Sequence, residues 1–141
     1  MIVDVFNPLT WSRVPPVRRL YLDNDGATAA LLDDVDYVWA VQWLWTVTPN
    51  STKCKVYATR NTRVPSSRRQ IKVYLHKEVL KRFAPVAPTA QHTICDHKNG
   101  ESLDCRRDNL RWATPLENRH NRYGDYARQE RLFDEVAPHV R

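Results

Sequence analysis

The sequence lacks three features that would assign it to a membrane or a secretory route: a long apolar run, a secretory start and paired cysteines. No stretch approaches the ~18 apolar residues of a membrane-spanning helix. The first residues, MIVDVFNPLTWSRVPP, hold an aspartate and prolines where a signal peptide needs a basic start and an apolar run. The three cysteines form no C-x-x-C pair, and their odd number favours reduced thiols. These absences predict an intracellular, non-secreted protein without a membrane partner.

Charge is unevenly divided between the two signs. The chain carries 22 Lys and Arg against 16 Asp and Glu, a formal net charge of +6. Such an excess favours an anionic partner, most often nucleic acid, and the alternative is a basic protein without one. With 42% hydrophobic residues, five Trp and six Tyr, the chain can bury a core, which excludes a disordered basic tail.

The pattern along the chain indicates an α+β fold, in which a small antiparallel sheet with short helices precedes a strand–loop–strand–helix module. An uncharged, proline-rich stretch, PVAPTAQ, separates the two parts. The expected segments are an N-terminal arm (1–17), a sheet-plus-helix region (18–84), a linker (85–91), the module (92–122) and a C-terminal helical tail (123–141) whose helix ends by Pro138.

Hydrophobic periodicity and turn residues predict the elements of the first part. Two short strands should flank the turn Asn24-Asp25-Gly26, and Asp33 or Asp34 should cap a helix from Val35 to Gln42. Three further strands are expected at 43–49, 55–62 and 70–76. A helix is expected at 76–83 and should end before Pro85.

The module lies around the stretch CDHKNGESLDCRRDNLRWATPLENRHN, residues 95–121. A strand, HTIC, should end just before Asp96 and His97, and a loop with an Asn-Gly turn should lead to a second strand, LRWAT. Thr114 as N-cap, Pro at the first helical position and Glu117 at the third form a capping box. A helix therefore begins at residue 115, with Asn118 in its first turn.

This order can bring Asp96 and Asn118 together if the helix packs on the hairpin. A carboxylate and an amide carbonyl suit a hard cation such as Mg²⁺, which keeps positions for water and substrate phosphate. A neutral His97 beside them could take a proton from an attacking water. Asn109, at the start of the second strand, could pin the loop through backbone hydrogen bonds. Such a site fits hydrolysis of a phosphodiester.

With these residues in place, DHKNG…LDCRRDNLRWAT…EN resembles the HNH, or ββα-metal, endonucleases, in particular the phage and intron-associated homing type. The resemblance spans roughly residues 18–122. It implies that His97 is the general base, that Asp96 and Asn118 bind a single Mg²⁺ or Mn²⁺, and that Asn109 is structural. The broader family often has His where this chain has Asn118, and Asn fits Mg²⁺ or Mn²⁺ better than Zn²⁺.

The resemblance further implies double-stranded DNA as the partner and a phage-encoded protein in a host cell, and leaves the number of copies open. A basic hairpin should bind the DNA backbone, unless it is only a solvated face; it holds Arg60, Arg63, Arg68, Arg69 and Lys72. Arg119 and Arg122, near the module's helix, should lie close to the scissile phosphate.

Several alternatives stay open at this point. A non-catalytic, sequence-specific DNA-binding module with a degenerate site is one. A structural zinc at Cys95 and Cys105 is another, although free thiols are favoured and no structural zinc is expected. His120 or Asn121 could complete the metal site. His76 could contact phosphate, although a partly buried structural role is favoured.

Overall fold

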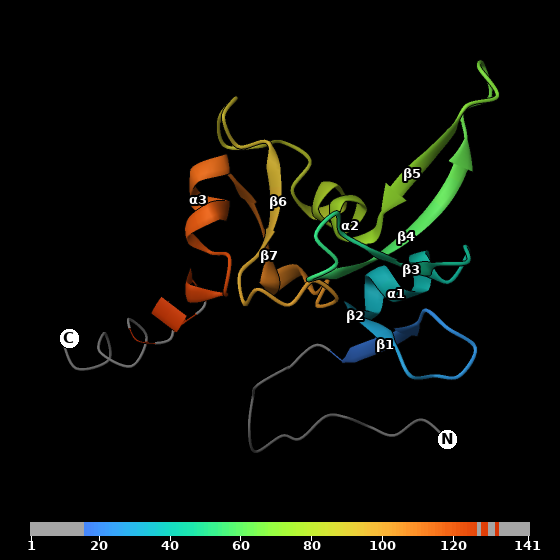
Figure 1. The fold of residues 1–141 in the computed structure, drawn as a ribbon, viewed down its shortest axis with the longest axis horizontal. Helices are drawn as coiled ribbons and strands as arrows, with labels where there is room; N and C mark the ends of the chain where they lie inside the picture. The colour runs from blue at the N-terminus through green and yellow to red at the C-terminus, as the bar shows by residue number, and fades with distance from the viewer. Residues whose placement is uncertain (1–15, 127, 130–131, 133–141) are drawn as a thin grey trace.

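The computed structural model of this chain describes residues 16–126, 128, 129 and 132. It has the mixed α+β architecture expected from the sequence, with short helices among small antiparallel sheets (Figure 1). Its elements are β1 (Val17–Tyr21), β2 (Ala29–Asp33), α1 (Asp34–Ala40), β3 (Thr46–Pro49), β4 (Val56–Arg63), β5 (Gln70–Tyr74), α2 (Leu75–Phe83), β6 (Ile94–His97), the 3₁₀ turn η1 (Arg107–Asn109), β7 (Leu110–Ala113) and α3 (Pro115–His120).

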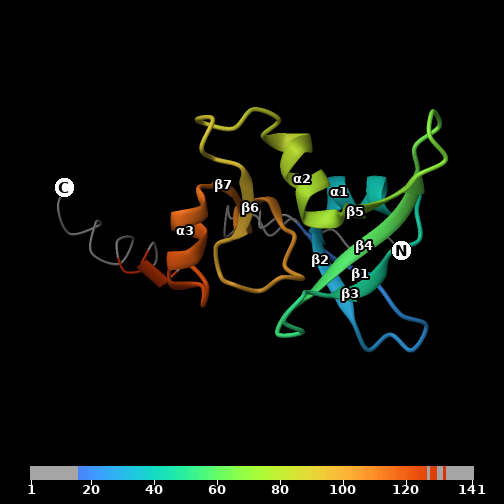
Figure 2. The same cartoon turned by 45° about the horizontal axis from the view of Figure 1, so that its top comes forward.

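The strands form three separate antiparallel sheets, β1–β2, β3–β4–β5 and β6–β7. The β6–β7 pair of the module was expected, whereas the single small sheet expected before it is divided into two. In both views α2 lies between the β4–β5 hairpin and the β6–β7 pair (Figures 1 and 2). The turn of the β4–β5 hairpin projects from the end of the molecule opposite α3.

Two element boundaries differ from the expectation in ways that matter for the site. Strand β5 ends at Tyr74, and Leu75 and His76 begin α2 instead of completing a strand. Strand β6 extends through Asp96 and His97 because these residues pair with Arg111 and Leu110 of β7. The two side chains thus project from a strand and not from a loop.

Most of the N-terminal arm and of the expected C-terminal helix lies outside the described residues. Residues 1–15 are among those not described, and β1 already begins at Val17. Of the helices in the described part of the chain, none has the length and apolar composition that crossing a bilayer requires.

The core lies where β2, β4, α2 and the β6–β7 pair meet. Helix α2 contributes Leu75, Val79 and Leu80, each at most 1% exposed, and β2 contributes Leu32. Val79 and Leu80 follow Leu75 by four and five residues, a spacing that places one face of the helix against the core. As a result, the next residue on α2, His76, is held against the module.

The sheet-plus-helix region and the module are joined by buried polar contacts. Asp36 of α1 is fully buried and accepts bonds from Arg107 Nε at 2.7 Å and Arg82 Nε at 3.0 Å. Leu31 of β2 exchanges backbone hydrogen bonds with Leu103 and Cys105 of the module's loop. The loop that leads to Asn109 is therefore fastened to residues more than 70 positions upstream.

Asp33 shows how these contacts override a local expectation. It occupies the N-cap of α1, as expected, but makes no side-chain cap hydrogen bond. Its Oδ2 instead accepts from the backbone N–H of Arg107 at 2.7 Å. The carboxylate that should cap its own helix thus anchors the η1 turn of the module.

Candidate functional site

Helix α3 is positioned by the capping box that the sequence predicts. The Thr114 side chain accepts from the backbone N–H of Glu117, and the Glu117 carboxylate accepts from the backbone N–H of Thr114. This reciprocal bonding satisfies two free donors at the helix start. The capping box fixes the residue at which α3 begins. It thereby places Asn118, in the first turn, and Asn121 and Arg122, which follow the helix, beside β6.

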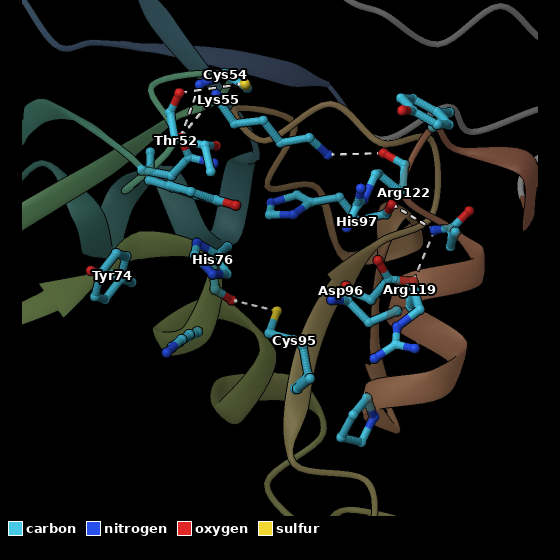
Figure 3. Close-up of a pocket in the computed structure, with 18 residues that line it drawn as sticks. Thr52, Cys54, Lys55, Tyr74, His76, Cys95, Asp96, His97, Arg119 and Arg122 are labelled. Atoms are coloured by element: carbon cyan, nitrogen blue, oxygen red, sulfur yellow. Dashed lines mark hydrogen bonds between the residues drawn. The ribbon is translucent and has the colours of Figure 1, made fainter.

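The side chains of Asp96 and His97 leave β6 on opposite faces, because successive strand residues alternate. Figure 3 shows Cys95 and His97 on the side of the strand that faces His76, and Asp96 on the side that faces α3. The candidate metal ligand and the candidate base therefore occupy the two sides of one strand end.

Asp96 is 5% exposed and is held by two donors. Its Oδ2 accepts from Arg111 Nε at 2.8 Å and from Asn121 Nδ2 at 2.9 Å. Both bonds fall on one oxygen, so Oδ1 is not used by any described residue. Asn121 also donates to the His97 carbonyl at 3.0 Å and accepts from the Tyr126 N–H at 2.7 Å. Asn121, expected only as a possible ligand, orients both residues of the Asp-His pair.

The donor set at this place fits a hard cation. Asp96 and Asn118 line the same cleft, and Asp96 offers a carboxylate oxygen directed toward α3. Over the described residues, no three His, Cys, Asp or Glu side chains are grouped as metal ligands. A cation here would be held by one carboxylate, one amide oxygen and waters, a coordination that suits Mg²⁺.

His97 is 7% exposed and its Nε2 is buried without a hydrogen-bond partner among the described residues. Burial, and after it the positive charge of Lys55, lower the pKa of His97 to about 4. The ring is therefore neutral near pH 7, the form in which imidazole can accept a proton.

Asn109 organises the loop that ends beside His97. Its Oδ1 accepts from the backbone N–H of Asn99 at 3.0 Å, and its Nδ2 donates to the Asp104 carbonyl at 2.9 Å. The Asn99-Gly100 turn expected from the sequence is present, with Gly100 at φ 76°, a conformation that favours glycine. This geometry matches the loop-pinning role expected for Asn109, and its contacts are with backbone rather than with the cleft.

Asp96 and His97 border a cleft of about 1030 Å³ between the β3–β4 turn, the start of α2, β6 and α3. Its cationic lining residues are Lys55, Lys77, Arg119 and Arg122, and Asp96 is the only acid among the described residues that line it. A cationic cleft with one carboxylate attracts a phosphate and still offers a ligand for a metal. Arg119 and Arg122 are exposed at this cleft.

Only four of the five basic residues expected on the β4–β5 hairpin share one exposed surface. Arg63, Arg68, Arg69 and Lys72 are exposed, with Arg68 and Arg69 at the turn itself. Arg60 is half-buried, and its guanidinium lies over the Trp43 ring at 4.5 Å. The register also places Arg60, opposite Val73, on the other face of the hairpin from Lys72, which pairs with Asn61. Arg60 therefore packs as part of the structure and does not share the exposed surface of the other four.

The cysteines of the module are buried thiols. Cys95 is 9% exposed and Cys105 is 1% exposed. Burial, and next the Asp96 charge, raise the pKa of Cys95 to about 12, and burial raises the pKa of Cys105 well above its ordinary value. Buried thiols with raised pKa values are chemically unreactive.

Three residues of the site were missed or underrated by the sequence argument. Arg111 pairs with Asp96, Asn121 bridges Asp96 and His97, and His76 faces His97 with 4.9 Å between ring centroids. A cross-strand pairing of Asp96 with Arg111 could have been found from the strand register. The approach of His76 depends on how α2 packs, which no local pattern shows.

Comparison with known proteins gives a family for the module. Residues 74–120 match the family model of the HNH endonucleases, so this segment is an HNH endonuclease domain. The match begins at the end of β5 and covers α2, β6, β7 and α3. No curated protein and no solved structure shows significant similarity to the chain.

Proposed function

We propose that this protein is a divalent-metal-dependent DNA endonuclease that hydrolyses a phosphodiester with His97 as general base. The observation that carries the proposal is that Asp96, His97 and Asn118 line one cationic cleft, Asp96 and His97 from the two faces of the end of β6, within an HNH endonuclease domain. The resemblance of the DHKNG…NLRWAT…EN motif to phage and intron-associated enzymes supports the homing type.

Each residue at the cleft would have a separate role in the proposed reaction. Asp96 and Asn118 hold Mg²⁺ or Mn²⁺, which supplies positive charge against the negative charge that develops on the phosphate. His97 Nε2 accepts the proton of the attacking water. Arg119 and Arg122 bind the backbone next to the reacting phosphate, and Arg111 and Asn121 keep the Asp96 carboxylate in place.

Cleavage of a supercoiled plasmid, with and without EDTA, tests the proposal. We expect Mg²⁺-dependent conversion to nicked product, and linear product only if two strands are cut in succession or by two copies. If the protein binds DNA but leaves the plasmid intact with Mg²⁺ or Mn²⁺, it is the non-catalytic DNA-binding module instead.

Replacing Asp96 by Ala should raise the Mg²⁺ concentration that gives half-maximal nicking by at least about tenfold. Asp96 offers a full negative charge, whereas Asn118 offers only an amide dipole, so Asn118→Ala should have the smaller effect. The measurement is the nicking rate against Mg²⁺ concentration for both variants, with thermal unfolding to show that each is folded. An unchanged titration curve for Asp96→Ala would remove this residue from the metal site.

Replacing Arg68 and Arg69 together by Ala should weaken binding to all duplexes alike. Each lost phosphate contact reduces the slope of log K against log salt by about 0.9, so the double variant should flatten it by up to ~2. Both side chains are exposed at the hairpin turn, whereas other loop arginines, such as Arg106 and Arg107, are engaged by carboxylates.

The matched control for this variant is Arg18→Ala with Arg19→Ala, which removes the same charge from exposed positions of β1. Duplex binding is titrated at several salt concentrations for all three proteins. Equal slopes for the hairpin variant and wild type would make the turn only a solvated face. A selective loss of affinity for target over random DNA would show that the turn contacts bases.

A further inference from the structure

The proposed mechanism leaves unused a second buried histidine at the same cleft. His76, the second residue of α2, is 5% exposed, lines the cleft and faces His97 at 4.9 Å between ring centroids. Figure 3 shows it across from β6, on the side where His97 projects. The two rings come from elements separated by the whole 84–93 connection.

His76 is buried as a structural residue would be, but among the described residues its side chain lacks the hydrogen bonds that a buried structural histidine normally makes. Its Nδ1 is buried and has no hydrogen-bond partner within the described part of the chain, as is also true of His97 Nε2. A buried polar atom left without a partner destabilises the folded state, and such atoms are rare in native proteins unless they have a functional reason. Here two such atoms lie on neighbouring rings at the wall of one cleft.

The surroundings of His76 hold the ring in place without satisfying that nitrogen. Tyr57 and Tyr74 pack against it, with ring centroids at 5.2 and 5.7 Å, and Cys95 Sγ donates to its backbone carbonyl. None of these contacts uses Nδ1. The ring is therefore oriented by packing at the wall of the cleft, and its Nδ1 has no partner among the described residues.

We propose that His76 is a second substrate-contacting residue of the nuclease site, which donates a hydrogen bond from Nδ1 to an oxygen of the DNA backbone phosphate in the cleft. Phosphate oxygens are acceptors only, so the imidazole must contribute its N–H. Burial, and next the charge of His97, keep the pKa of His76 low, at about 2. The ring thus acts as a neutral donor, and no proton is transferred by it.

This inference rests on the proposed endonuclease function, and the variants are chosen to separate the two. His76→Phe keeps an aromatic ring between Tyr57 and Tyr74 and removes both nitrogens. His76→Asn places an amide nitrogen near the position of Nδ1, whereas in His76→Gln the amide lies farther out, nearer the position of Nε2. Thermal unfolding of each variant shows whether it is folded.

The main experiment is single-turnover nicking of a supercoiled plasmid at saturating protein with Mg²⁺. We expect His76→Phe to lower the rate by about 10- to 100-fold and to raise the dissociation constant for duplex DNA by a smaller factor, because the bond strengthens as negative charge builds on the phosphate in the transition state. His76→Asn should recover most of the rate and His76→Gln little. Cleavage by His76→Phe within about threefold of wild type would overturn the proposal, as would equal impairment of His76→Phe and His76→Asn.

A second measurement does not need activity or the Phe variant. The imidazole nitrogens of ¹⁵N-histidine-labelled wild-type protein are recorded by NMR with and without a short duplex, in EDTA so that no cleavage occurs. The Nδ1 signal of His76 should shift when the duplex saturates the protein, and an unmoved signal would contradict the contact. If wild type fails to nick the plasmid, the nuclease function fails, and this measurement still decides whether His76 meets the backbone.

Discussion

Replacing His97 by Ala is expected to lower the rate of plasmid nicking by about 10²–10⁴-fold, the usual contribution of a general base. Binding of short duplexes should stay unchanged, because the ring is 7% exposed and the exposed cations at the cleft, Lys77, Arg119 and Arg122, are untouched. The nicking rate and the dissociation constant are measured on the same protein preparation. A variant that cuts within a few-fold of wild type would show that His97 is not the base.

The matched control for that variant is His92→Ala. His92 lies outside the lining of the cleft, and its Nδ1 shares a hydrogen bond with Thr89 Oγ1 at 2.7 Å. We expect this variant to cut at the wild-type rate, so that a loss at His97 reports its position in the cleft and not the loss of a histidine as such.

Replacing Asp36 by Ala is expected to lower the free energy of unfolding by about 3 kcal/mol. Breaking a buried ion pair usually costs about 3–5 kcal/mol, and the partly exposed Arg82 and Arg107 side chains can turn to water, which favours the low end. Urea denaturation measures the change. Asp34→Ala is the control on the same helix, since its pair with Arg18 is half-exposed and worth less than about 1 kcal/mol.

The same carboxylate should make stability depend on pH. Burial alone would raise the pKa of Asp36, but the hydrogen bonds and charges of Arg107 and Arg82 outweigh it and hold the pKa below its ordinary value. A lowered pKa in the folded state contributes stability above the unfolded value, about 3.9, and loses it as the pH falls through the folded value. Wild type should therefore lose this contribution below about pH 4, and the Asp36 variant should lose less over the same range.

Local patterns predicted the parts of the fold that short-range bonding determines. The start of α3 was predictable because Thr114 and Glu117, three residues apart, bond to each other. The Asn99-Gly100 turn was predictable for the same reason. By contrast, the end of β6 was misjudged because pairing with β7, and not local propensity, carries the strand through His97.

The candidate site shows the same division. The motif brings Asp96, His97 and Asn118 to one cleft, while their roles as ligands and base stay predictions. The contacts that hold these residues are longer in range: Asn121 reaches back 25 positions to Asp96, and Arg107 reaches 71 positions to Asp36. Such contacts depend on how helices and strands pack, and the spacing of residues in the sequence does not predict them.

The pairing of Leu31 with the module's loop bears on whether the module can be transplanted. Residues 92–122 taken alone would lose the partners of the Leu103 carbonyl and the Cys105 N–H, both supplied by Leu31. They would also lose the carboxylate that binds Arg107. The minimal portable unit thus extends upstream to β2, and recombination at the proline-rich connection would separate the nuclease motif from the backbone that completes it.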